Sequence, residues 1–526
     1  MPNHKKKIRH IFCTAFADLG RLFQCKLQFK FTAAIHRKAA KSAAYFDVIS
    51  RGIYDMNKVI EWFYNFLWGD LFTLHFGDVS IGIPLLVLLL IPAGIFFTIR
   101  TKFMPVRKFP QMIRALSDKN DDKTSLSTFQ TLIVSTATRV GMGNLVGVVA
   151  AISIGGAGAV FWMWASALLG ASTAYVEGTL AQLHKKKDPL YGGYHGGPAY
   201  YIHDFVEQKR KKKIKKSFLA ILFAFFGLIC WCGISQVISN SVTSAFKNAF
   251  SIPPIYTTVV LVALAAVIVL RKNATVKFLD VIVPVMAVLY FAVTIFIILK
   301  NIKLMPGVFS RIFQEAFGFK QIAGGGFGAV LMNGVKRGLF SNEAGSGSAP
   351  CAAAAAEGKR PETVGMVQSL GVLIDTIVIC TCTAMIMLLA PREITDGLQG
   401  MDLLQAAMNY HLGSGGTIFV AIVLFLFSFS TFIGILFYAR SNVAYLCGNN
   451  WISQTIYKII ALVMLFMGGL QAYTIVWDLG DVGIGLMTII NLIILVPMSK
   501  EAIAILDKKE DKAEKLKEKA KKNKLK

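Results

Sequence analysis

Two stretches decide the fold: residues 138–147 read Thr-Arg-Val-Gly-Met-Gly-Asn-Leu-Val-Gly, and residues 338–350 read Gly-Leu-Phe-Ser-Asn-Glu-Ala-Gly-Ser-Gly-Ser-Ala-Pro. Each lies in a long apolar segment. Irregular backbone at membrane depth leaves polar groups unpaired unless it lines a cavity, so glycines and charges there indicate a broken helix at a site. Two such breaks, one in each half of a chain, are typical of transporters built from inverted repeats.

A broken helix offers two kinds of ligand to a small molecule. The N-terminal end of a half-helix presents N–H groups to a carboxylate, and exposed carbonyls coordinate a monovalent cation. Glycines allow the backbone to approach the ligand closely. An amino acid together with a cation such as sodium fits this geometry.

Close helix packing through small residues is the alternative explanation of the glycines. It accounts for Gly155 and for the alanines at 352–356. It does not account for Asn144, Asn342 and Glu343, which stand beside glycines in the two stretches. We therefore favour a binding site.

The composition places most of the chain in lipid. Of 526 residues, 55% are hydrophobic and 16% are charged, and apolar segments of about 20 residues recur after residue 80. We predict an all-α polytopic membrane protein with about eleven transmembrane helices, in which one extra helix precedes a 5+5 inverted repeat. The expected spans are 80–100, 127–155, 158–184, 217–246, 254–270, 274–300, 322–355, 364–390, 416–445, 452–471 and 477–498.

The net charge of +26 reports topology. Lysines and arginines gather in the connectors between the spans and in the tail, which is typical of cytoplasmic loops, not of a nucleic-acid-binding face. With eleven spans, the basic connectors and the C-terminus fall in the cytoplasm. Residues 1–51 are also basic, yet this topology exports them. An amphipathic surface segment and a natural start at Met56 both remain open.

The predicted organisation has five parts. Residues 1–56 form a basic extension, 57–126 hold the first helix and a basic connector, 127–300 and 301–498 are the two five-helix repeats, and 499–526 form a charged cytoplasmic tail.

Four quoted stretches resemble signatures of the alanine or glycine:cation symporter family, the sodium:alanine symporters. They are TRVGMGNLVGVVAAISIGGAGAVFWMWASALLGASTAYVEGTLAQLHK (138–185), GGPAYYI (196–202), GVKRGLFSNEAGSGSAPCAAAAA (334–356) and QSLGVLIDTIVICTCTA (368–384). The resemblance implies a leucine-transporter-type fold in a bacterial inner membrane. It also implies uptake of alanine, glycine or another neutral amino acid with sodium, or in some cases with protons, and no other cofactor.

The resemblance also implies roles for residues of the two breaks. The Met142 and Gly143 N–H groups would hold the substrate carboxylate. The Val140 carbonyl and the hydroxyls of Ser430 and Thr431 would hold sodium. The side chain of Asn144 would face the substrate or the cation, with a helix cap as the alternative. The opposite wall would comprise Ser341, Asn342, Gly345, Ser346 and Gly347.

One position departs from the family pattern. Where the family commonly has a Glu after Tyr438 and Ala439, this chain has Arg440. If that Glu serves the coupling ion or a gate, coupling is altered here; if it lies at the cytoplasmic end of the span, little changes.

Several charged residues are expected within spans, where an unpaired ionised group costs roughly 3 kcal/mol or more. We predict that Arg139 pairs with Glu343. Lys336 and Arg337 either pair as well or extend to the interface. Asp375 with Thr376 is a candidate second cation site, and Glu343 or Asp375 could carry a proton instead. Arg139, Glu343 and Asp375 are therefore the coupling and gating candidates.

Gln236 and Asn240 stand one helical turn apart, so both would face the substrate together, or both would bond a neighbouring helix. Other classes of function have little support. A channel requires a continuous polar pore, and an enzyme requires a catalytic or metal-binding constellation that the scattered histidines and cysteines do not supply.

Overall fold

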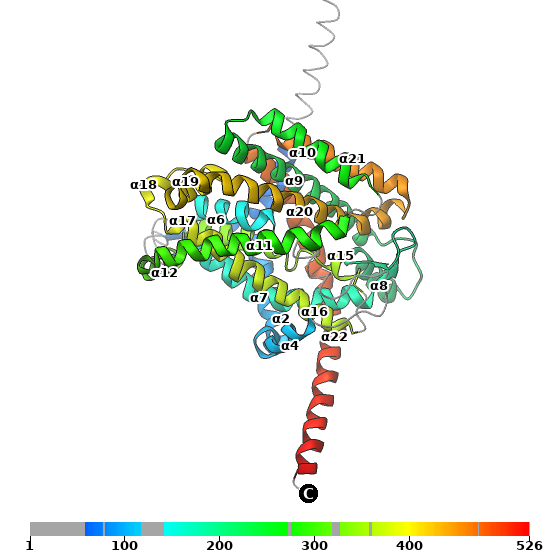
Figure 1. Cartoon of the computed structure of the whole chain (residues 1–526). Coiled ribbons are helices and arrows are strands. Elements are labelled where there is room, and N and C mark those ends of the chain that lie inside the picture. Colours follow the sequence, from blue (N-terminus) through cyan, green and yellow to red (C-terminus); the bar gives the residue numbers. More distant parts are fainter. Residues whose placement is uncertain are drawn as a thin grey trace, which may run out of the picture. The chain divides into compact units, whose positions relative to one another are not determined.

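The computed structural model of the chain describes residues 58–76, 79–116, 141–271, 275–317, 327–356, 360–471 and 473–524. The chain divides into two compact units, Met1–Trp62 and Phe63–Lys526. Every element from β1 to α22 belongs to the second unit, and nearly all of them are helices (Figure 1). The prediction of an all-α fold is confirmed in so far as nearly all elements are helices.

A short hairpin precedes the first long helix. Strand β1 (Asp70–Phe76) pairs antiparallel with β2 (Val79–Pro84), and α2 (Leu85–Arg100) follows directly. The prediction of a helix from residue 80 is therefore wrong at its start. Isoleucines at 81 and 83 alternate with smaller residues, as in a strand, and Pro84 lies at the N-cap of α2, where its missing N–H does no harm.

The first series of long helices follows the predicted spans closely. The helical elements in this part are α3 (Met104–Arg107), α4 (Phe109–Ala115), η1 (Gly143–Gly147), α6 (Val148–Gly155), α7 (Gly158–Leu183), α8 (Pro198–Arg210), α9 (Phe218–Phe250), α10 (Pro254–Val269), α11 (Thr275–Lys300), η2 (Ile302–Leu304) and α12 (Met305–Phe317). The connector between α7 and α8 carries the two-residue strands β3 (Lys186–Lys187) and β4 (Tyr194–His195). The short helices α8 and α12 were not expected, because neither is long enough to register as a span.

The second series contains the other break. Its helical elements are α14 (Phe327–Asn342), α15 (Pro350–Ala353), α16 (Pro361–Val372), η3 (Leu373–Cys380), α17 (Thr381–Leu388), α18 (Arg392–Thr395), α19 (Gly400–Leu412), α20 (Ser414–Cys447), α21 (Trp451–Gly468) and α22 (Tyr473–Lys524). The elements α16, η3 and α17 run on as one apolar span, Pro361–Leu388, with a π-helical centre.

Six helices among the described residues are long and apolar enough to cross a membrane. The bent pair formed by the end of α11 and residues 302–317, which turns by 74°, brings the number to seven. Apolar helices α2, α10 and the η1–α6 segment are shorter. The count of eleven and the inverted repeat remain predictions.

Helix α9 lies at the centre of the packing and contacts α20, α21 and α22. Glycines bring α9 and α22 together: a Cβ at Gly233 would lie 2.3 Å from the backbone nitrogen of Gly480, and one at Gly483 would lie 2.5 Å from the Cα of Cys230. Small residues let helix backbones approach in this way where the hydrophobic effect between helices is absent.

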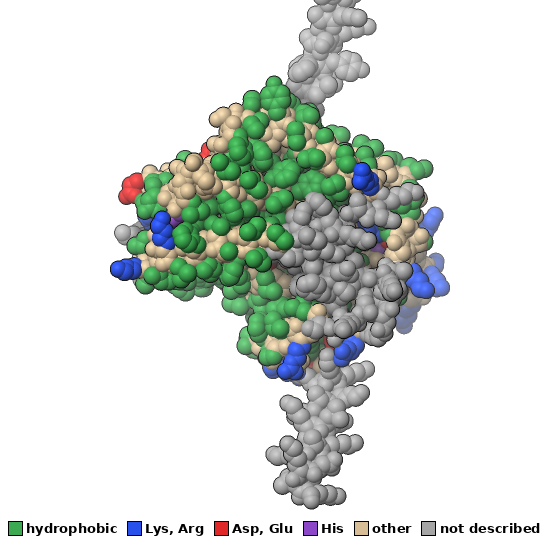
Figure 2. Space-filling view, viewed as in Figure 1, with side chains coloured by type: hydrophobic (Ala, Val, Ile, Leu, Met, Phe, Trp, Pro, Cys, Tyr) green, Lys and Arg blue, Asp and Glu red, His purple; other side chains and the backbone are tan. Residues whose placement is uncertain are grey.

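The outer surface is strongly apolar. Figure 2 shows hydrophobic side chains over much of the described part of the visible face, with most of the visible lysines and arginines toward its edges. On α10 and α11, Val260 is 56% exposed and Val288 is 67% exposed. A soluble monomer rarely exposes an apolar area of this extent, so the face suits lipid.

Two cations of α14 are buried on the helix before its break. Lys336 and Arg337 are each 3% exposed and both contact Asp481 of α22, which is 1% exposed. The guanidinium of Arg337 donates two hydrogen bonds of 3.0 Å to the carboxylate of Asp481. The alternative in which these cations extend to the interface is therefore wrong. Their partner Asp481 was not identified from the sequence.

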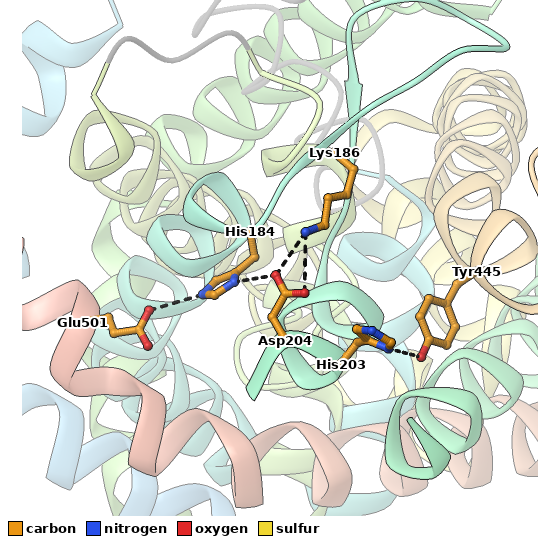
Figure 3. A network of polar contacts seen from close by, with 6 residues as sticks. All are labelled: His184, Lys186, His203, Asp204, Tyr445 and Glu501. Atoms are coloured by element: carbon orange, nitrogen blue, oxygen red, sulfur yellow. Dashed lines mark hydrogen bonds and ion pairs between the residues drawn. The ribbon is translucent and has the colours of Figure 1, made fainter. Parts of the chain in front are cut away.

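A polar network joins the end of α7 to α8 and α22 (Figure 3). His184, the residue after α7, places Nδ1 2.9 Å from Asp204 of α8 and Nε2 3.2 Å from Glu501 of α22. Lys186 lies 3.3 Å from the same Asp204 carboxylate. Only a protonated imidazole can donate from both nitrogens, so the network favours the charged form of His184.

The network makes stability depend on pH. Burial lowers the pKa of His184, but the hydrogen bonds and charges of Asp204 and Glu501 outweigh burial and raise this pKa above its ordinary value of 6.5. A raised folded-state pKa stabilises the protein fully below pH 6.5, and this contribution is lost as pH rises through the folded pKa. We expect thermal stability to fall over that range by about 1.5 kcal/mol, one charge-assisted hydrogen bond.

His184→Gln should remove this pH dependence, measured by heat denaturation of the purified protein from pH 6 to pH 9. His203→Gln is the matched control, because His203 Nδ1 contacts the Tyr445 hydroxyl at 2.9 Å. An unchanged pH slope in His184→Gln would contradict the assignment.

Candidate functional site

The break in α14 is a buried loop with unusual backbone. Helix α14 ends at Asn342, and α15 begins at Pro350. Between them Glu343, Gly345 and Gly347 have φ of +58°, +91° and +82°. Positive φ in a residue other than glycine is strained and persists where the surroundings hold it. The predicted break is present here.

Side chains within the loop satisfy part of its backbone. The Asn342 Oδ1 accepts a hydrogen bond from the Ala344 N–H at 3.0 Å, and Ser346 Oγ donates to the Glu343 carbonyl at 2.7 Å. Both residues were predicted to line the substrate wall. In this conformation their side chains hold the loop itself. A substrate could therefore bind only the hydrogen-bond donors and acceptors of Asn342 and Ser346 that the loop does not use.

The second break lies directly against the first. The π-helix η1 begins at Gly143, and a Cβ added there would lie 3.5 Å from the Phe340 ring and 3.6 Å from Ser341 Cα. The predicted sites in spans two and seven therefore meet. Arg139 and Val140 lie outside the described residues, so the proposed Arg139–Glu343 pair and the Val140 carbonyl ligand stay predictions.

A cluster of oxygen atoms joins the two breaks at Asp375. The Ser341 hydroxyl lies 2.6 Å from Asp375 Oδ2 and 3.2 Å from Asn144 Oδ1. Its single proton can serve one acceptor, and the shorter contact selects Asp375. The Thr376 hydroxyl also donates to Asp375 Oδ2, at 2.8 Å.

Burying the polar groups of this cluster costs free energy, which must be offset by hydrogen bonds or by a bound ion. Asp375 and Asn144 are fully buried, and Ser341 is 1% exposed. Asp375 lies in η3, and π-helical turns inside α-helices are frequent at functional sites. Carboxylate, amide and hydroxyl oxygens are the ligands that hard cations prefer. The arrangement therefore suits a small cation beside the two breaks.

Helix α20 contacts the break at η1 through the predicted sodium residues. The Met142 N–H donates to Thr431 Oγ1 at 3.0 Å, while the hydroxyls of Ser430 and Thr431 donate to the Phe427 carbonyl at 2.9 and 2.8 Å. Thr431 is thus beside the break, as expected. A substrate carboxylate that binds the Met142 N–H would have to replace Thr431.

Gln236 contacts a neighbouring helix. Its Nε2 lies 3.2 Å from the sulfur of Met464 in α21, and Asn240 donates to the carbonyls of Gly468 and Gln471 at the end of the same helix. These contacts match the alternative of interhelical bonding, so the structure gives no support to Gln236 as a substrate ligand.

Glu343 and Arg440 have partners that the sequence did not reveal. The Tyr438 hydroxyl donates to Glu343 Oε2 at 3.2 Å. Arg440 forms an ion pair of 3.0 Å with Asp188, and its guanidinium lies 3.4 Å from the centre of the Tyr191 ring. Arg440 therefore binds the connector between α7 and α8, and the departure at this position places no unpaired cation at the breaks.

Three polar contacts at the breaks were missed from the sequence: the Ser341–Asp375 bond, the Tyr438–Glu343 bond and the bond of 3.0 Å from Asn491 Nδ2 to the Gly345 carbonyl. A polar residue in an apolar span was the available signal for Asn491. Partners for the other two could not be read from the sequence, since the two residues of each bond come from different segments of the chain.

The chain matches known proteins over most of its length. A sequence model described as the sodium:alanine symporter family matches residues 70–524. A probable sodium/glutamine symporter of Bacillus subtilis, GlnT, is 42% identical over 80% of this chain and 87% of its own length. The amino-acid carrier protein AlsT of the same organism is 40% identical over 79% and 87%.

A sodium/alanine symporter of Methanococcus maripaludis, AgcS, is 36% identical over 79% of this chain and 92% of its own length. The chain belongs to the sodium:alanine symporter family.

Proposed function

We propose that this chain is a secondary active symporter that imports a small neutral amino acid, with alanine or glycine as the first candidates, together with sodium by alternating access. The observation that carries the proposal is the meeting of the two broken helices at Ser341, Asn144 and Asp375. Family membership and the names of the relatives support sodium and an amino acid as the transported species.

In the proposed mechanism, the amino acid binds between the breaks. Gly143 begins η1, and N–H groups at the start of a helix suit an anion such as a substrate carboxylate. The Met142 N–H would have to exchange its bond with Thr431 for one with the carboxylate. The loop with Ser341, Gly345 and Gly347 forms the opposite wall. The small side chains of this wall suit a small substrate.

Sodium is proposed to bind through oxygen ligands beside the breaks. One set is the predicted one, with Val140, Asn144, Ser430 and Thr431. The other is centred on Asp375 with Asn144, Ser341 and Thr376, whose carboxylate offsets the charge of the ion. Asp375 or Glu343 would serve a proton instead if protons drive transport.

The proposal includes the bacterial inner membrane as location and a cytoplasmic C-terminus. The basic connectors and tail support this orientation. No cofactor besides the co-transported ion is proposed.

The test is uptake of radiolabelled alanine by the full chain in proteoliposomes, with an inward sodium gradient, an inward proton gradient or neither. We expect accumulation above the external concentration with sodium alone. Unlabelled glycine, serine and glutamine added as competitors rank the substrates, and each is also tested as a radiolabelled substrate. Absence of concentrative uptake of all four amino acids under both gradients would overturn the proposal.

A further inference from the structure

A buried carboxylate on α7 binds the backbone of the α14 break. Glu177 is 1% exposed, and its Oε2 accepts a hydrogen bond of 3.0 Å from the Gly345 N–H. Its other oxygen, Oε1, accepts from Asn491 Nδ2 at 2.6 Å. The two oxygens of Glu177 thus connect the broken loop to α22.

Asn491 binds the carbonyl group of Gly345. Its Nδ2 also donates to the Gly345 carbonyl at 3.0 Å, and the Tyr201 hydroxyl of α8 donates to its Oδ1. Asn491 and Tyr201 are both fully buried. Side chains from α7 and α22 therefore satisfy both the N–H and the C=O of Gly345.

These hydrogen bonds offset the free-energy cost of unwinding a helix in lipid. Gly345, at φ +91°, cannot take part in a regular helix, and each buried backbone group without a partner costs at least 1 kcal/mol. An ionised acceptor is stronger than a neutral one, so a carboxylate is well suited to bind such an N–H. The loop conformation then depends on Glu177.

We propose that Glu177, acting with Asn491, is a positioning residue that fixes the α14 loop in the form that receives the amino acid. The inference rests on the proposed function, because the loop is the proposed substrate wall. Ser341 connects this loop to the cation cluster at Asp375, whereas Glu177 binds it at Gly345. Loss of Glu177 therefore acts first on the amino acid and much less on sodium.

The experiment compares Glu177→Gln with the exchange variant E177Q/N491D. A glutamine oxygen can accept from Gly345, but its NH₂ group then faces the Asn491 amide, donor against donor. In the exchange variant, the glutamine donates to the new carboxylate on α22, which removes the donor clash and retains one buried charge, but the Gly345 carbonyl loses the bond from the Asn491 amide. Glu393→Gln, an exposed carboxylate of α18, is the control for loss of a charge.

For Glu177→Gln we expect the KM for alanine to rise roughly tenfold, the effect of one buried hydrogen bond. The sodium concentration for half-maximal uptake should change less than about twofold. The exchange variant should recover part of the alanine KM, because it removes the donor clash but not the loss at the Gly345 carbonyl, and Glu393→Gln should match the native protein. Unchanged KM in Glu177→Gln, or a defect that the exchange variant leaves in full, would overturn the inference.

Hydrogen exchange of a peptide covering residues 343–349 gives a readout that needs no transport. Glu177→Gln should speed exchange in this peptide, and the exchange variant should slow it in part. If the native protein concentrates no amino acid, the proposed function fails, while faster loop exchange in Glu177→Gln still supports positioning. If Glu177→Gln does not fold, recovery of folding by the exchange variant supports the inference and continued failure overturns it.

Discussion

Asp375→Ala should abolish sodium-driven accumulation of alanine. The substitution removes the carboxylate that receives both the Ser341 and the Thr376 hydroxyl groups, at 2.6 and 2.8 Å. Loss of a directly bound charge costs about 2 to 3 kcal/mol, which corresponds to a roughly 30- to 150-fold weaker affinity for sodium. The measurement is initial uptake in proteoliposomes against sodium concentration.

Two further variants test the cause of this loss. Asp375→Asn keeps the shape and removes the charge, so it should weaken sodium dependence while retaining alanine exchange across the membrane. Asp396→Ala is the matched control, because Asp396 lies exposed after α18. Sodium dependence of native strength in Asp375→Ala would place the coupling ion elsewhere, and the Ser430–Thr431 set would become the first site to examine.

The sequence was most informative where a residue type contradicts its surroundings. Glycines and polar residues in an apolar segment located the break at 343–349, because lipid does not tolerate such residues without a cause. Helices α7, α9 and α10 were predicted to within a few residues for the converse reason: long apolar segments with basic ends have few alternatives. These signals are local, and no knowledge of tertiary contacts was required.

The features that were missed depend on contacts between distant segments. Residues 373–380 form the π-helix η3, although LIDTIVIC reads as an ordinary apolar helix. The pairing of Arg337 with Asp481 joins residues 144 positions apart. For Gln236 the sequence left the substrate and a neighbouring helix as alternatives, because both faces of α9 are apolar enough that the sequence alone could not show which one contacts α21.

Asp481→Ala should be the most destabilising single substitution among the buried charges. It leaves two cations, Lys336 and Arg337, in a region where each is 3% exposed. Breaking a buried pair by removing one partner costs roughly 3–5 kcal/mol, because the other charge stays buried without compensation. The measurement is heat-induced loss of the monodisperse peak of purified protein in size-exclusion chromatography.

Removal of a cation should cost less than removal of the anion. In Arg337→Met, Lys336 still lies 3.3 Å from Asp481 Oδ2, so the carboxylate retains a partner. Lys336 also keeps its contact of 2.7 Å with the Tyr64 hydroxyl. The combined variant R337M/D481L leaves one cation instead of two, so it should be more stable than Asp481→Ala. Asp481 is the partner of both Lys336 and Arg337, whereas Arg337 is only one of two partners of Asp481. Equal stability of Asp481→Ala and Arg337→Met would therefore contradict the assignment of Asp481 as the partner of both cations.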